Sequence, residues 1–102
     1  MTLDNLITTL LSFEENNDLE IVLLSINELK EDIMVKAKFY EGDLLITVLA
    51  IEQSFWQTNP ELWTQLTKII DFQEHKIKDQ NVSFEMKVDW YEKIEKYKNI
   101  SF

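Results

Sequence analysis

Residue types that commonly carry catalysis are scarce in this chain. The one histidine, His75, lies between Glu74 and Lys76 at a polar position of a helical pattern, so we interpret it as a solvated surface side chain. There is no cysteine and no arginine, and Gly42 is the only glycine. The chain therefore cannot build a thiol nucleophile, a cysteine-based zinc site, an arginine clamp or a glycine-rich phosphate loop. The sequence predicts a protein that is not an enzyme, with no catalytic residues, no metal and no cofactor.

Carboxylates are the one abundant reactive group, and several of them occur in pairs. Two carboxylates can act together as the acid and base of a glycosidase or can bind a metal ion. The calcium-loop pattern is absent, however, and the pairs fall where we expect element ends and turns, at which acids are usually solvated. A carboxylate-based enzyme is therefore kept only as an alternative that needs a pocket gathering two of these groups. The pairs are Glu14 with Glu15, Asp18 with Glu20, Glu31 with Asp32, and Glu41 with Asp43.

The acidic side chains are distributed unevenly along the chain. Residues 1–61 contain twelve acids and three lysines, a net charge of −9, whereas residues 62–102 contain seven of each and are neutral. A charge of this size opposes binding to nucleic acid and to anionic membrane surfaces. We therefore expect no direct nucleic-acid contact, no membrane contact and a basic protein as the partner.

Two features mark the residues that would contact such a partner. Asp18 and Glu20, at strand spacing, would lie roughly 6.8 Å apart, comparable to successive phosphates of a nucleic-acid strand. Phe55 and Trp56 stand in a loop-like segment from which both cannot easily point inward, so one of them can serve as an exposed anchor. The predicted partner-binding residues are Glu14, Glu15, Asp18, Glu20, Glu28, Glu31, Asp32, Glu41, Asp43 and Trp56.

The spacing of apolar residues predicts the helices that help to position these side chains. Apolar residues recur every three or four positions over residues 3–15 and predict a helix capped by Thr2. Pro60 is typical of a first helical position, and the spacing that follows predicts a helix over residues 60–79. A short helix is expected over residues 91–97.

Four segments have the pattern of β-strands. Residues 19–27 and 44–51 are apolar on both faces, whereas residues 33–41 and 82–90 alternate between apolar and polar types. The only glycine lies in the short connection after the second segment and predicts a tight hairpin. The expected fold class is α+β, a single domain over residues 1–102 with the order α-β-β-β-α-β-α, in which helices pack on an antiparallel meander of three to four strands.

Apolarity on both faces of two predicted strands leaves two explanations open. Helices cover both faces of the sheet, or a second copy of the chain covers one face and makes a homodimer.

The one-sided charge and the lack of catalytic groups together favour a small binding protein that blocks a basic partner. An immunity protein or inhibitor of a nuclease-type toxin, or of a nucleic-acid-binding protein, fits this description. A dimeric protein resembling secretion chaperones, which would hold a segment of a client protein, is the alternative suggested by the order helix, three strands, helix. The chain has no signal-peptide pattern and no apolar run long enough for a membrane span, which favours the cytoplasm.

Overall fold

The computed structural model describes residues 1–12 and 19–102. In this part of the chain the protein forms seven helices and no strand, so the predicted α+β meander is wrong. The helices are α1 (Leu3–Leu11), α2 (Leu19–Glu31), α3 (Asp43–Leu49), α4 (Gln53–Thr58), α5 (Pro60–Phe72), α6 (Glu74–Lys78) and α7 (Phe84–Lys98).

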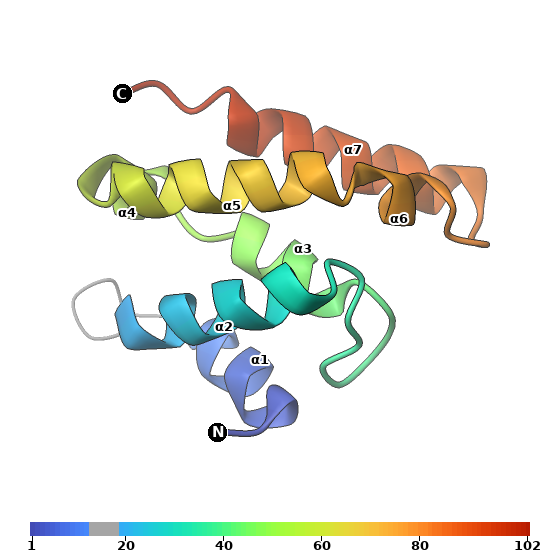
Figure 1. Cartoon of the computed structure of the whole chain (residues 1–102), viewed down its shortest axis with the longest axis horizontal. Helices are drawn as coiled ribbons and strands as arrows, with labels where there is room; N and C mark the ends of the chain where they lie inside the picture. Colours follow the sequence, from blue (N-terminus) through green and yellow to red (C-terminus); the bar gives the residue numbers. More distant parts are fainter. Residues whose placement is uncertain (13–18) are drawn as a thin grey trace.

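Helix α3 lies at the centre of the molecule (Figure 1). It contacts α1 and α2 on one side and α7 on the other, while α5 contacts α2, α4 and α6. The two ends of the chain lie on opposite sides of the molecule.

The segment predicted as the first strand, residues 19–27, belongs to helix α2. Its buried side chains recur every three or four residues, which is the spacing of one helix face. The exposed leucines between them make the sequence look apolar on both faces and hide that period. The buried residues of α2 are Val22, Ser25, Ile26 and Leu29.

The second and third predicted strands are also absent. Residues 33–41 form a loop whose only ladder contact is an isolated antiparallel bridge between Lys36 and Glu41. Most of the segment 44–51 lies in α3, which Gly42 precedes as the N-cap with a left-handed φ of 88°. The glycine therefore starts a helix and does not form the expected hairpin turn.

Residues 82–90, predicted as the fourth strand, begin the longest helix, α7. The hydroxyl of Ser83 caps this helix, and the alternation arises because Phe84 and Val88 point to solvent. The short helix expected over residues 91–97 is part of the same element. The buried residues of α7 are Trp90, Ile94 and Tyr97.

The other two predicted helices are present. Helix α1 begins after Thr2, whose side chain accepts a hydrogen bond from the N–H of Asn5, while residues 13–15 of that prediction lie outside the described part. The helix predicted over residues 60–79 is divided at Gln73 into α5 and α6.

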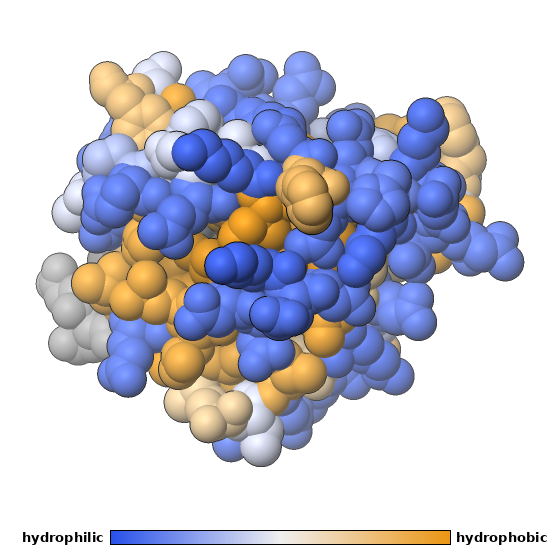
Figure 2. Space-filling model, in the orientation of Figure 1, coloured by the Kyte–Doolittle hydropathy of each residue, from blue (hydrophilic) through white to orange (hydrophobic). Residues whose placement is uncertain are grey.

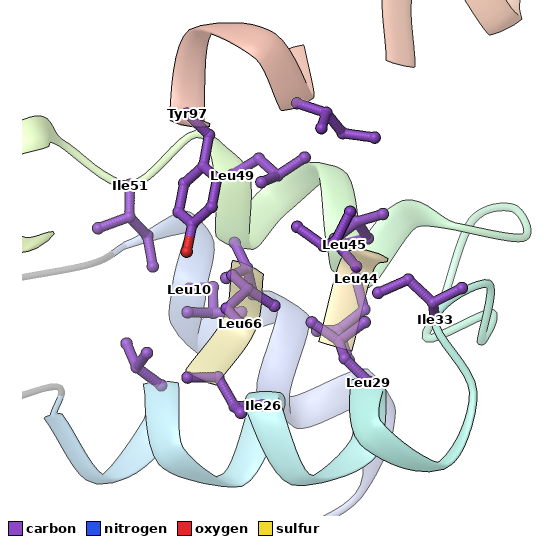
Figure 3. Packing of buried hydrophobic residues seen from close by; sticks show 14 of the residues in the cluster. Leu10, Ile26, Leu29, Ile33, Leu44, Leu45, Leu49, Ile51, Leu66 and Tyr97 are labelled. Carbon is purple, nitrogen blue, oxygen red and sulfur yellow. The ribbon is translucent and has the colours of Figure 1, made fainter. Parts of the chain in front are cut away.

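The buried apolar side chains form one cluster to which all seven helices of the described part contribute, and Figure 3 shows part of it. Leu44, Leu45 and Leu49 of α3 lie in the middle of this cluster, between Leu29 of α2 and Tyr97 of α7. The secretion-chaperone alternative and the homodimer were both expected from predicted strands, and the described residues contain helices or loop in place of these strands.

Candidate partner-binding surface

The ten predicted partner-binding residues fall into three groups. Glu14, Glu15 and Asp18 lie outside the described residues. Asp43 and Trp56 are buried, with 2% and 0% of their surface exposed, so neither side chain is available to a partner. The remaining five are at the surface on α2 or on the loop that follows it: Glu20, Glu28, Glu31, Asp32 and Glu41.

Trp56 is a core residue of the α4–α7 region. Its ring makes edge-to-face contacts with Phe55 and with Tyr97, each at a centroid distance of 5.2 Å. Phe55 is buried too, so the expectation that one of these two rings is exposed does not hold. The reason is that the segment is a helix, and both rings lie against the core on it.

Helix α2 presents a face of acids and leucines to solvent, which we call the α2 face. With 100° of rotation per residue, its members point directly away from the buried side of the helix. Glu20 and Glu31 are eleven residues apart and hence about 16 Å apart along the axis, with two leucines between them. The members of the α2 face are Glu20, Leu23, Leu24, Asn27 and Glu31.

The apolar part of this face is unusual for a solvent-facing helix. Leu23 and Leu24 are 40% and 37% exposed, and the neighbouring Leu19 is 44% exposed. Figure 2 shows apolar surface among hydrophilic side chains over the region of α1 and α2. Exposed apolar residues with a polar rim are typical of protein interaction sites. The sequence pattern does not reveal these leucines as exposed, because their segment is apolar on both faces, as in a buried strand.

Helix α2 carries three acids against one lysine, Lys30, so its net charge is −2. Within the described part of the chain, Glu20, Glu28 and Glu31 have no ion-pair partner. In residues 62–102 seven lysines offset the seven acids, and two of these acids form ion pairs, Asp89 with Lys93 at 2.7 Å and Asp71 with Lys98. The unpaired acids give the α2 side of the molecule a negative field that a basic surface would complement.

Gln73 fixes the end of α2 and the start of the following loop. Its amide oxygen accepts the N–H of Ile33 at 2.9 Å, and its amide nitrogen donates to the carbonyls of Leu29 and Lys30 at 3.0 Å each. The side chain is buried between α5 and α6, and it thereby caps the last turn of α2 from another part of the fold.

The loop of residues 36–41 is organised by Asp43. The carboxylate of Asp43 accepts hydrogen bonds from the N–H groups of Ala37, Lys38, Phe39 and Tyr40 at 2.7, 2.9, 2.7 and 3.4 Å. Burial raises the pKa of the Asp43 carboxyl, but the four N–H donors outweigh burial and hold that pKa below its usual value. A charged Asp43 therefore holds the loop in shape.

Ionisable groups line several surface grooves of the described residues. One lies between the loop and α6, where the acids Asp32, Glu41 and Asp79 face Lys36 and Lys76, and His75 also lines it. Asp32 lies 3.8 Å from Lys76, so acids and bases offset one another in this groove. In the described residues no three His, Asp or Glu side chains are grouped so that they could hold a metal ion.

A second groove, of about 690 Å³, runs between the end of α3 and α7. Its walls combine apolar residues such as Ile51, Tyr97 and Ile100 with the ion-paired Asp89 and Lys93. It has space for a partner side chain, but it holds no histidine and no nucleophile beside a base.

These features describe a helical protein with an acidic helix face that bears exposed leucines. The chain belongs to the family of CDI immunity proteins, whose family model matches residues 7–66. Proteins of this family bind a toxin, and the role of this chain is accordingly that of an immunity protein that blocks a toxin. No curated protein and no solved structure matches the chain. None of the helices in the described part is long and apolar enough to cross a membrane.

The family match coincides with the acidic half of the molecule. Residues 7–66 contain eleven acids and three lysines, so they carry −8 of the net charge of −9. They include all of α2, the 36–41 loop, α3 and α4, and they end within α5. The balanced helices α6 and α7 lie outside the match.

Proposed function

We propose that this protein is a non-enzymatic inhibitor that blocks its toxin by covering a basic surface with the α2 face. The observation that carries the proposal is the pair of unpaired acids, Glu20 and Glu31, at the two ends of the exposed leucine pair. An interface needs an apolar centre that excludes water and a polar rim that selects the partner, and the α2 face has both.

The two parts of the α2 face contribute differently to binding. Burying Leu23 and Leu24 supplies affinity, because apolar surface leaves water on contact. Unpaired acids speed the encounter with a basic partner and favour it over acidic proteins. Affinity for the toxin should therefore depend on the leucines and on the acids, whereas the association rate should depend mainly on the acids.

A toxin that acts on nucleic acid fits this inhibitor. Such a toxin needs lysine and arginine side chains to hold phosphates, so its active surface is basic. An inhibitor with a net charge of −9 and no arginine complements that surface and competes with the nucleic acid for it. We therefore propose a nuclease-type toxin as the partner class.

The test measures binding to the purified toxin that this protein blocks. Association and dissociation rates are recorded between about 50 and 300 mM salt, a range over which surface electrostatics are progressively screened. The test variant carries Glu20→Lys and Glu31→Lys. The control carries Glu85→Lys and Glu95→Lys, two exposed acids of α7 whose reversal changes the net charge by the same amount.

We expect the test variant to lose about tenfold or more in association rate at low salt and to show a weaker salt dependence. The control should change by less than about threefold, since its charges lie away from the contact. Equal losses in both variants would show that only the net charge matters, and that result would contradict the assignment of the α2 face.

A further inference from the structure

We infer that the loop of residues 36–41 is a second, preformed contact for the toxin, with Phe39 and Tyr40 as its anchors and Asp43 as the positioning residue. This inference rests on the proposed function, because the occupant of the surface is the same basic toxin. It adds aromatic residues and a buried carboxylate to the interface, neither of which the charge pattern identifies.

The hydrogen bonds of the loop turn its backbone inward and its side chains outward. Four successive N–H groups, from Ala37 to Tyr40, converge on the single carboxylate of Asp43. At the base, the N–H of Gly42 donates to the carbonyl of Met34 at 3.1 Å. As a result Phe39 is 58% exposed and Tyr40 is 41% exposed on a loop whose backbone is already fixed.

Fixed, exposed aromatic residues are what a binding loop requires. Large rings supply much contact area, and a loop that is ordered before binding loses little entropy when the partner arrives. Exposing the apolar ring of Phe39 to water is unfavourable in free energy. A loop with only a structural role would have no interaction that offsets this exposure.

The local charges suit a basic partner. The ammonium group of Lys38 lies 3.5 Å from the carboxylate of Asp4 and 5.5 Å from the centre of the Phe39 ring. Lys38 is thus paired with Asp4, and the other lysine of the loop, Lys36, lies in the groove with Asp32, Glu41 and Asp79, so neither lysine is an isolated positive charge beside the two rings. An aromatic ring beside an acid attracts lysine and arginine side chains of the partner.

The loop also lies close to α2 in the chain. It follows the end of α2 (Figure 1), and between the two the carboxylate of Asp32 accepts the N–H of Met34 at 3.0 Å. Both surfaces lie within residues 7–66, the stretch that defines the family. Phe72 and Phe84 are more exposed, at 83% and 81%, but they stand singly on helices outside that stretch.

The test compares two double variants against the same purified toxin at about 300 mM salt, where surface charge contributes least. One variant carries Phe39→Ala and Tyr40→Ala, and the matched control carries Phe72→Ala and Phe84→Ala. We expect the loop variant to dissociate about tenfold faster or more, with the salt dependence of association unchanged. The control should dissociate within about twofold of the unmodified protein.

The outcomes separate this inference from the proposed function. If the loop variant binds like the unmodified protein while Glu20→Lys with Glu31→Lys weakens binding, the loop inference is overturned and the α2 face stands. If neither variant changes binding, both proposals fail. A loss in the loop variant equal to that in the control also overturns the inference, because any exposed ring would then have the same effect.

Asp43→Asn, combined with the loop variant in a double-mutant cycle, tests whether Asp43 positions Phe39 and Tyr40. If Asp43 acts by holding the loop, Asp43→Asn weakens binding in the unmodified protein but adds nothing once Phe39→Ala and Tyr40→Ala are present. Equal losses in both backgrounds would contradict the positioning role. Circular dichroism at the assay temperature verifies that each variant is folded.

Discussion

The N–H of Phe39 donates a hydrogen bond to the carboxylate of Asp43 at 2.7 Å, across four residues of chain. This bond links an exposed aromatic residue to a buried acid, although the sequence pattern placed the first in a strand and the second on the surface. It also explains why residues 33–41 are a loop. Backbone N–H groups that converge on one carboxylate cannot alternate between the two edges of a strand.

The stability supplied by Asp43 should depend on pH. In the unfolded chain its pKa is about 3.9, and in the folded protein the four N–H donors lower it. The folded state therefore favours the ionised form, so the contribution is complete above the unfolded pKa and is lost as pH falls through the folded pKa. Asp43→Asn should lower the free energy of unfolding by about 1–3 kcal/mol at pH 7.

Urea unfolding followed by tryptophan fluorescence provides the measurement. The difference between the unmodified protein and Asp43→Asn should be constant from about pH 7 to pH 5 and should shrink below about pH 4. The exposed Asp89→Asn is the control and should show a difference of less than about 1 kcal/mol throughout. If the difference in unfolding free energy between the unmodified protein and Asp43→Asn grew towards low pH, the proposed stabilisation by the ionised Asp43 would be contradicted.

Gly42 should resist substitution. Its φ of 88° is left-handed, and a Cβ atom added there would lie 2.7 Å from the terminal methyl carbon of Met34. The methionine end can move, but the backbone strain remains, so Gly42→Ala should destabilise the fold by about 1–2 kcal/mol. Thermal unfolding measures this effect, and an unchanged melting temperature would show that the backbone at Gly42 is not held in that conformation.

Gln73→Leu should destabilise the protein more than a surface glutamine replacement does. The substitution leaves the N–H of Ile33 and the carbonyls of Leu29 and Lys30 without their partner, a cost of about 2–3 kcal/mol. Gln65→Leu on the exposed side of α5 is the matched control and should cost less than about 0.5 kcal/mol. Similar unfolding free energies for the two variants would rule out a role for Gln73 in capping α2.

The leucines of the α2 face should matter for toxin binding and little for folding. Leu23→Ala with Leu24→Ala should raise the toxin dissociation rate about tenfold or more, because apolar residues at the centre of an interface carry much of its affinity. Val88→Ala on α7 is the control, since Val88 is 38% exposed and lies outside the family match. An unchanged dissociation rate of the leucine variant would show that Leu23 and Leu24 are not the apolar centre of the interface.

The sequence predicts the helices whose polar and apolar positions are cleanly separated. In α5, Leu62, Leu66 and Ile70 are buried at helical spacing and the exposed positions are mostly polar, so pattern and structure agree. In α2, exposed leucines occupy positions between the buried residues. The segment is therefore apolar on both faces, and its pattern predicts a strand. One of the four wrong strand predictions therefore falls on the helix that we propose for the toxin contact, and the other three fall on the loop after α2, on α3 and at the start of α7.

Of the candidate site, only the negative charge could be predicted from the sequence. Glu20, Glu28, Glu31 and Glu41 are acids at the surface, as the charge asymmetry indicates. The burial of Asp43 depends on four backbone N–H groups that come together only in the folded loop, and no local pattern reveals that arrangement. The exposure of the aromatic loop residues follows from the same arrangement.

Hydroxyl-radical footprinting of the protein with and without the toxin tests the central claim most directly, because oxidation reports the exposure of individual side chains. We predict that the toxin lowers the oxidation of the two leucines of the α2 face and of Phe39 and Tyr40, and leaves Phe72 and Phe84 unchanged. Protection of Phe72 and Phe84 while the α2 leucines stay reactive would place the toxin on the balanced half of the molecule and contradict the account.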